Sequence, residues 1–111
     1  MQACLHEAPN ETAEQHARRI EAVQFTRLVL SVEAQLAAHS PTGAYADLNQ
    51  LSASPDMRPL PASGQYVPGF ELHLDVMNKG YWFEFVDKTD PCGFRFISNQ
   101  AGVIFTAQPI R

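Results

Sequence analysis

An uninterrupted stretch of helix-forming residues, Thr12 to His39, is the feature that most constrains this chain. Neither Gly nor Pro occurs within it, and Pro41 and Gly43 mark its end. A helix of this length spans roughly 40 Å at about 1.5 Å per residue. The rest of a 111-residue chain builds a smaller globular body, so we expect one end of the helix to pack on that body and the other to project.

Two apolar faces are predicted on this helix. The main stripe follows the helical period and contains Phe25, Leu28, Val29, Val32 and Leu36. We expect the sheet to cover this stripe, with Phe25, Val29, Val32 and Leu36 buried and residues 12–19 largely exposed. The second, thinner face lies on roughly the opposite side, and we interpret it as a subunit-contact face: Ile20, Val23, Leu30 and Ala34.

The pattern along the rest of the chain predicts one α+β domain, in which a long N-terminal helix packs on a four-stranded antiparallel sheet. Residues 1–11 are polar and are expected to be flexible. Residues 12–39 form the helix, and residues 40–68 form a connecting loop rich in Pro, with a short helix from Ala44 to Leu51. Residues 69–108 form the sheet, because apolar and polar side chains alternate there between short turns.

The aromatic face of the predicted sheet should cover the main stripe of the helix. The first strand alternates Phe70 to Val76 with polar residues, and Asn78-Lys79-Gly80 predicts a hairpin turn into the second strand. The last two strands contain Phe94, Phe96, Val103 and Phe105. Every connection is a hairpin rather than a helical crossover, which indicates antiparallel pairing.

Composition excludes several classes of function. The net charge of −4 provides no electrostatic footprint for nucleic acid. No apolar run approaches the roughly 20 residues of a membrane-spanning helix, and the N-terminus is not a signal peptide. Two cysteines are too few for a disulfide framework and leave the cellular compartment open.

Acidic residues and histidine suggest two metal-site hypotheses, each with a plainer reading. Glu71, His73 and Asp75 share one face of a strand, as metal ligands would, but a solvent-facing strand explains the same alternation. Asp87 and Asp90 could offer oxygens to calcium, but a solvated turn explains them equally simply. The plainer readings are favoured, so we expect no metal and no cofactor.

No group of residues predicts catalysis. Cys92 has no histidine-containing motif nearby, so a packed thiol is expected, and Cys4 and Cys92 are placed at opposite ends of the predicted fold and should not form a disulfide. Trp82 is expected to pack in the sheet or lie on an edge strand, whereas an exposed Trp82 would mark a contact site. We therefore expect that the protein is not an enzyme.

Several segments resemble the type IV pilin and type II secretion pseudopilin superfamily, over roughly residues 12 to 108. They are Ala17-Arg18-Arg19-Ile20-Glu21-Ala22-Val23-Gln24 with Glu33-Ala34-Gln35-Leu36-Ala37-Ala38, then Pro41-Thr42-Gly43-Ala44-Tyr45-Ala46-Asp47-Leu48-Asn49-Gln50-Leu51, Gly80-Tyr81-Trp82-Phe83 and Phe94-Arg95-Phe96-Ile97-Ser98-Asn99-Gln100-Ala101-Gly102-Val103-Ile104. They are similar to the second half of a pilin spine helix, the segment after it, and the central and last strands. The family's leader and apolar first half of the helix are absent from this sequence. Either a truncated soluble domain or a derived protein that no longer assembles in the usual way would explain this, and the first is favoured.

The resemblance implies a non-enzymatic structural subunit of a pilus-like or pseudopilus filament. Its partners would be copies of itself or related pilins, and the missing segment would anchor it in the inner membrane before assembly. The head would then face the periplasm or the cell exterior. A secreted or periplasmic cystatin-like binding or inhibitor module is the alternative, because a long helix against an antiparallel sheet describes that class as well.

Overall fold

The long helix α1 runs from Ala13 to His39 in the computed structural model, which describes residues 4–7, 10–57 and 66–108. Thr12 begins it as the N-cap, and its side-chain oxygen accepts a hydrogen bond from the Gln15 N–H at 3.1 Å. Ser40 adopts an extended conformation and ends it, followed by Pro41. The helix therefore begins at a capping residue and ends just before Pro41, which marks its predicted end.

A second helix, α2, spans Leu48–Ser52 and is shorter than the predicted Ala44–Leu51. Asp47 determines where it starts, because its side chain accepts from the Gln50 N–H while the Gln50 side chain accepts from the Asp47 N–H. Residues 58–65, the centre of the predicted proline-rich loop, lie outside the described residues.

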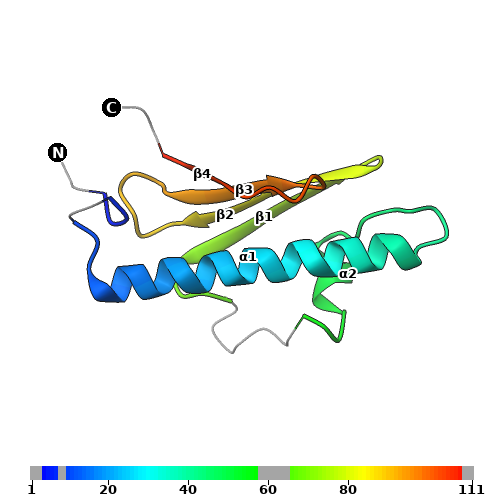
Figure 1. The fold of residues 1–111 in the computed structure, drawn as a ribbon, viewed down its shortest axis with the longest axis horizontal. Helices are drawn as coiled ribbons and strands as arrows, with labels where there is room; N and C mark the ends of the chain where they lie inside the picture. The colour runs from blue at the N-terminus through cyan, green and yellow to red at the C-terminus, as the bar shows by residue number, and fades with distance from the viewer. Residues whose placement is uncertain (1–3, 8–9, 58–65, 109–111) are drawn as a thin grey trace.

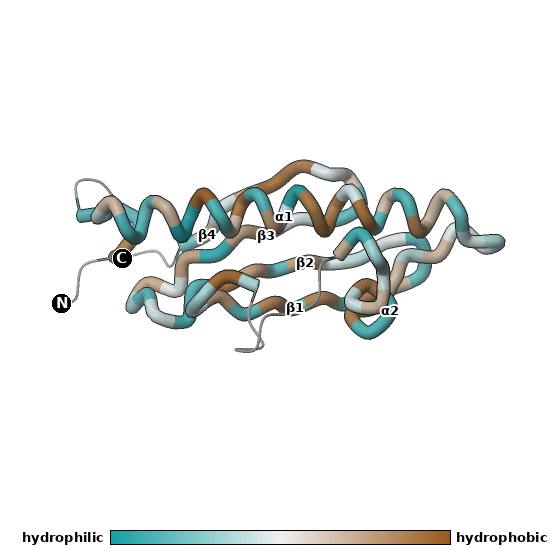
Figure 2. The backbone as a smooth tube through the Cα atoms, turned by 90° about the horizontal axis from the view of Figure 1, so that it is seen from below, coloured by the Kyte–Doolittle hydropathy of each residue, from teal (hydrophilic) through white to brown (hydrophobic). Residues whose placement is uncertain are grey.

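Four antiparallel strands form one sheet in the order β1-β2-β3-β4, namely Phe70–Met77, Gly80–Asp87, Arg95–Asn99 and Phe105–Ala107. The predicted α+β class with one long helix and a four-stranded antiparallel sheet is confirmed. Figure 1 shows α1 along one side of the sheet, with α2 on the same side. Figure 2, coloured by hydropathy, shows apolar segments both along α1 and along the strands.

The core lies between α1 and the strands. Phe25 of α1 meets Phe85 of β2 with ring centroids 4.8 Å apart, and Phe85 in turn meets Phe70 of β1 at 5.1 Å. The buried residues of α1 follow the helical period and are Ala22, Phe25, Thr26, Val29, Val32 and Glu33. Compared with the predicted stripe, this face is rotated: Leu36 is only partly buried and Leu28 is 36% exposed.

The last strand departs from the predicted packing. Phe105 is 61% exposed and Val103 is 54% exposed, so neither covers the helix, contrary to our expectation. Ile104, between them, is partly buried and packs against the core instead, and the buried Ser98 of β3 donates its hydroxyl to the Val103 carbonyl at 2.8 Å. The alternation of side chains along a strand predicts which residues share a face, but it leaves open which of the two faces meets the core.

The N-terminal end of α1 does not project, and that prediction is wrong. Arg18, in the second turn of α1, donates to the carbonyl of Pro68 and to the carboxylate of Asp87 at the end of β2. Its guanidinium also lies 5.1 Å from the centroid of the Phe70 ring. Residues 12–14, 16 and 17 are exposed as expected, whereas Gln15, Arg18 and Arg19 are half-buried.

Truncating Val32 to Ala should lower the free energy of unfolding by about 1–3 kcal/mol, because Val32 is 2% exposed and its loss leaves a cavity. Urea unfolding followed by circular dichroism measures the change. Gln35→Ala, at an exposed position of the same helix, is the matched control and should leave the unfolding midpoint unchanged. Equal midpoints for both variants would contradict the packing of α1 described here.

Candidate functional site

Residues 4–6 and Glu11 form a clasp against the end of the sheet, so this part of the segment predicted to be flexible makes specific contacts. Cys4 and Cys92 form a disulfide, with Cα atoms 5.3 Å apart, so the predictions of no disulfide and of a packed thiol at Cys92 are both wrong. The physical reason is that residues 4–7 turn back from the start of α1 and reach the turn after β2. Residues 1–3 and 8–9 lie outside the described residues.

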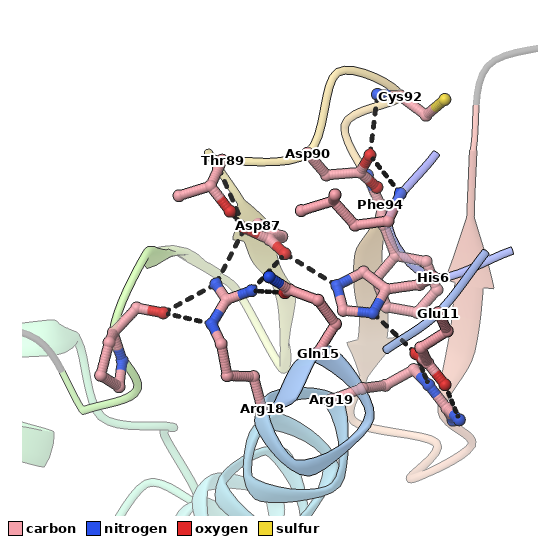
Figure 3. A network of polar contacts seen from close by, with 12 residues as sticks. His6, Glu11, Gln15, Arg18, Arg19, Asp87, Thr89, Asp90, Cys92 and Phe94 are labelled. Carbon is pink, nitrogen blue, oxygen red and sulfur yellow. Dashed lines mark hydrogen bonds and ion pairs between the residues drawn. The ribbon is translucent and has the colours of Figure 1, made fainter. Parts of the chain in front are cut away.

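His6 is the centre of the clasp, and its side chain is fully buried (Figure 3). Its Nε2 lies 2.7 Å from Asp87 Oδ2, and its Nδ1 lies 2.8 Å from Glu11 Oε2. The imidazole also lies against the ring of Phe94, with centroids 4.7 Å apart. The buried ring therefore has a polar partner for each nitrogen and an apolar partner for its face.

Asp87 connects three parts of the chain. Its carboxylate accepts hydrogen bonds from Arg18 of α1 and from the N–H and hydroxyl of Thr89, and it pairs with His6 of the N-terminal residues. Burial alone would raise the pKa of Asp87, but these hydrogen bonds outweigh it, so the pKa lies below its usual range. Asp87 is thus a buried structural carboxylate that stays ionised.

Asp90 has a similar structural role. Its two carboxylate oxygens accept from the backbone N–H groups of Leu5, Cys92 and Phe94 at 3.0–3.2 Å. The solvated turn that we favoured for Asp87 and Asp90 is wrong, since they are 0% and 6% exposed. Nitrogen donors and a guanidinium face these oxygens, which is the arrangement of a clasp rather than of a calcium loop.

The buried His6–Asp87 pair resembles part of a catalytic dyad but lacks the rest of one. Both side chains are 0% exposed, and the second nitrogen of His6 faces Glu11 rather than a hydroxyl or thiol nucleophile. A substrate therefore has no path to the imidazole in this conformation. The clasp is chemically suited to holding the chain together.

Glu11 forms the outer part of the clasp. It accepts two hydrogen bonds from Arg19, at 2.8 and 2.9 Å, and also faces His6 and His16. The Arg19 hydrogen bonds are the main cause that lowers the pKa of Glu11 to about 2, against the opposing effect of burial. Arg19 and His16 belong to the first two turns of α1, whereas His6 lies before it, so Glu11 fixes the turn that sends the chain back toward the sheet.

The other predicted candidates lie elsewhere on the molecule. Glu71 Oε1 and His73 Nε2 are 2.9 Å apart on the exposed face of β1, and within the described residues no group of three or more potential metal ligands is found. On the predicted subunit-contact face, Ile20 is 37% exposed and Ala34 is exposed, whereas Val23 and Leu30 are partly buried against the core. The structure thus divides this face between surface and core.

Trp82 is 40% exposed on the sheet face that points away from α1. Together with Ile97 and Phe105 it lines a groove of about 260 Å³, with Ser98 and Asn99 as the polar lining. Phe105 was expected in the core, so sequence reasoning missed this groove. Beside it, Glu84 and Arg95 form an ion pair at 3.0 Å across neighbouring strands.

No protein-family model, no curated protein and no solved structure matches this chain. Among the described residues, no helix has the length and apolar character needed to cross a membrane.

Replacing both cysteines by Ser should lower the free energy of unfolding by about 2–5 kcal/mol, because the disulfide closes a loop with a sequence separation of 88. Urea unfolding of the oxidised protein and of the double variant measures the difference. A reducing agent should bring the unmodified protein to the stability of the variant and leave the variant unchanged. Two reactive thiols in the native protein without reductant would contradict the disulfide.

Acid should weaken the clasp over a defined range of pH. The pKa of Glu11 is lowered in the folded state, so its contribution to stability is present above the ordinary value of 4.5 and is lost as the pH falls to about 2. Glu11→Gln should therefore reduce the loss of stability between these pH values, measured by urea unfolding. Glu14→Gln, at an exposed position in the first turn of α1, should keep the unmodified pH dependence.

Proposed function

We propose that this protein is a non-enzymatic structural subunit of a filament of the type IV pilus or type II secretion pseudopilus kind. The observation that carries the proposal is one long helix, α1, beside an antiparallel meander whose strands follow in sequence order. This is the arrangement that the resemblance implies. The partners in the proposal are copies of the same chain or related pilins, and no cofactor is involved.

The Cys4–Cys92 disulfide supports a location outside the reducing cytosol. Disulfides persist in the periplasm and at the cell surface, where the head of a filament subunit would face. Anchoring in the inner membrane before assembly, by a segment preceding the present sequence, belongs to the same proposal. The clasp limits how such a segment could join α1. If the helix continued through residues 4–12, His6 would have to leave its buried position between Asp87 and Glu11.

Contacts between subunits would use the outward side of α1 rather than its N-terminal turn. Ile20 and Ala34 lie on nearly the same side of the helix, and Arg27 and Ser31 lie between them at helical spacing, all exposed or nearly so. Since polar residues interrupt the apolar ones, the burial available is small. We therefore expect a monomer in equilibrium with weakly associated species.

Ile20→Glu and Ala34→Glu should each weaken self-association by about tenfold, which corresponds to roughly 1.4 kcal/mol, because they place a charge in the contact. Analytical ultracentrifugation of the oxidised protein over a wide concentration range measures the dissociation constant. Val103→Glu is the matched control, since Val103 is an exposed apolar residue outside α1. Each variant should retain the unmodified thermal unfolding midpoint.

A cystatin-like binding or inhibitor module is the second candidate, and the groove of Trp82, Ile97 and Phe105 is the observation that favours it. Such a module would be monomeric at every concentration. A screen against a panel of proteases, with Trp82→Ala as the test variant, separates the two functions. The filament proposal would be contradicted if the protein stayed monomeric at every concentration and also inhibited a protease, with Trp82→Ala abolishing that inhibition.

A further inference from the structure

Glu33 is a fully buried carboxyl group in the middle of the core face of α1. Its side chain is 0% exposed, and its Oε1 accepts a hydrogen bond from the backbone N–H of Ala46 at 2.7 Å. Its Oε2 is buried and has no hydrogen-bond partner among the described residues. Neither the clasp nor the proposed contact face uses this group, and a buried polar atom without a partner is costly.

The hydrogen bond from Ala46 is the polar contact that attaches the segment after α1 to the helix. Ala46 is 6% exposed, and the next residue, Asp47, is the N-cap of α2. Tyr45 packs its ring against Tyr81 of β2 at 5.0 Å, in an edge-to-face arrangement. Residues 44–47 therefore form a cover over Glu33, attached on one side to α1 and on the other to β2.

Among the described residues, the charged neighbour that acts on Glu33 is acidic. Asp47 of the covering segment places a negative charge nearby, which disfavours the carboxylate form of Glu33. Tyr45 and Tyr81 are the other titratable neighbours. The pKa of the Tyr81 hydroxyl is raised above its usual range, mainly by burial and secondly by the nearby Glu33 carboxyl group. No described group thus compensates the charge of an ionised Glu33 except the single N–H of Ala46.

We propose that Glu33 is a proton-operated latch: the neutral side chain keeps residues 44–47 and the start of α2 docked on α1, and release of its proton to water opens this cover. In the closed form Oε1 of the neutral acid accepts the hydrogen bond from the Ala46 N–H. In the open form water reaches the carboxylate and solvates both of its oxygens. The latch acts within one chain and is independent of the filament proposal.

The direction of the effect follows from the cost of ionising a buried acid. Burial is the main cause that raises the pKa of Glu33 to about 7 from an ordinary value of 4.5; the Ala46 hydrogen bond opposes this rise and Asp47 adds to it. A raised pKa means that the closed form is favoured below pH 4.5 and loses stability as the pH rises toward 7. The opening of the latch is therefore favoured progressively as the pH rises from 4.5 to about 7, and further alkali adds little.

Amide hydrogen exchange of Ala46, read by NMR, tests the latch directly. The protection factor of this amide already corrects for the intrinsic effect of pH on exchange. It should fall by about 25-fold between pH 5.5 and pH 8, because the Glu33 pKa is 4.5 in the open form and about 7 in the closed form. In Glu33→Gln, which keeps the accepting oxygen but cannot ionise, protection should not change with pH. Glu21→Gln, an exposed position of the same helix, should respond as the unmodified protein does.

Two results would overturn the proposal. One is equal protection of Ala46 at both pH values in the unmodified protein. The other is a fall in Glu33→Gln as large as in the unmodified protein, which would assign the pH dependence to another group. If Glu33→Gln does not fold, the carbon-13 shift of the Glu33 carboxyl in the unmodified protein replaces it, and a midpoint near 4.5 would contradict the latch.

Discussion

The buried carboxylate of Asp87 is the interaction on which the arrangement of this protein depends. A carboxylate taken out of water is stable only where several donors replace its hydration. Here they come from Arg18 in α1, from Thr89 beyond β2 and from His6 near the N-terminus. Satisfying one charge therefore requires that the helix, the sheet and the N-terminal residues meet at the same place, and removing any of these donors leaves a buried charge with fewer partners.

The clasp also decides which surfaces remain for other molecules. By holding the start of α1 against the end of β2, it leaves the outward side of the helix and the opposite face of the sheet exposed. The first surface has isolated apolar side chains separated by polar ones, whereas the second has Trp82 and Phe105 close together beside a groove. The filament and binding-module proposals differ in which of these two surfaces they use.

Periodicity predicts the elements of this fold well because it reports local burial. The limits of α1 follow from Thr12 and Pro41, and the strands follow from alternation between turns. The clasp was missed because its partners, such as His6 and Asp87, are 81 positions apart and no local pattern relates them. The available signal was modest: an even number of cysteines, with acidic residues just before Cys92 and a histidine just after Cys4. Glu33 was missed for another reason, because an acidic residue on a helix is normally assigned to the exposed face.

The position of the disulfide gives the oxidised chain the topology of a ring. The bond joins residues separated by 88 positions, so both helices and the first two strands lie within the ring, while β3 and β4 belong to a tail outside it. When the protein unfolds with this bond intact, the ring stays compact and only the tail extends freely. Less surface is then exposed to denaturant, so the unfolding transition of the oxidised protein is broader than that of the reduced one. A protease cut between the two helices, in the exposed turn at residues 41–44, would open the ring without separating the pieces, which would remain one covalent molecule.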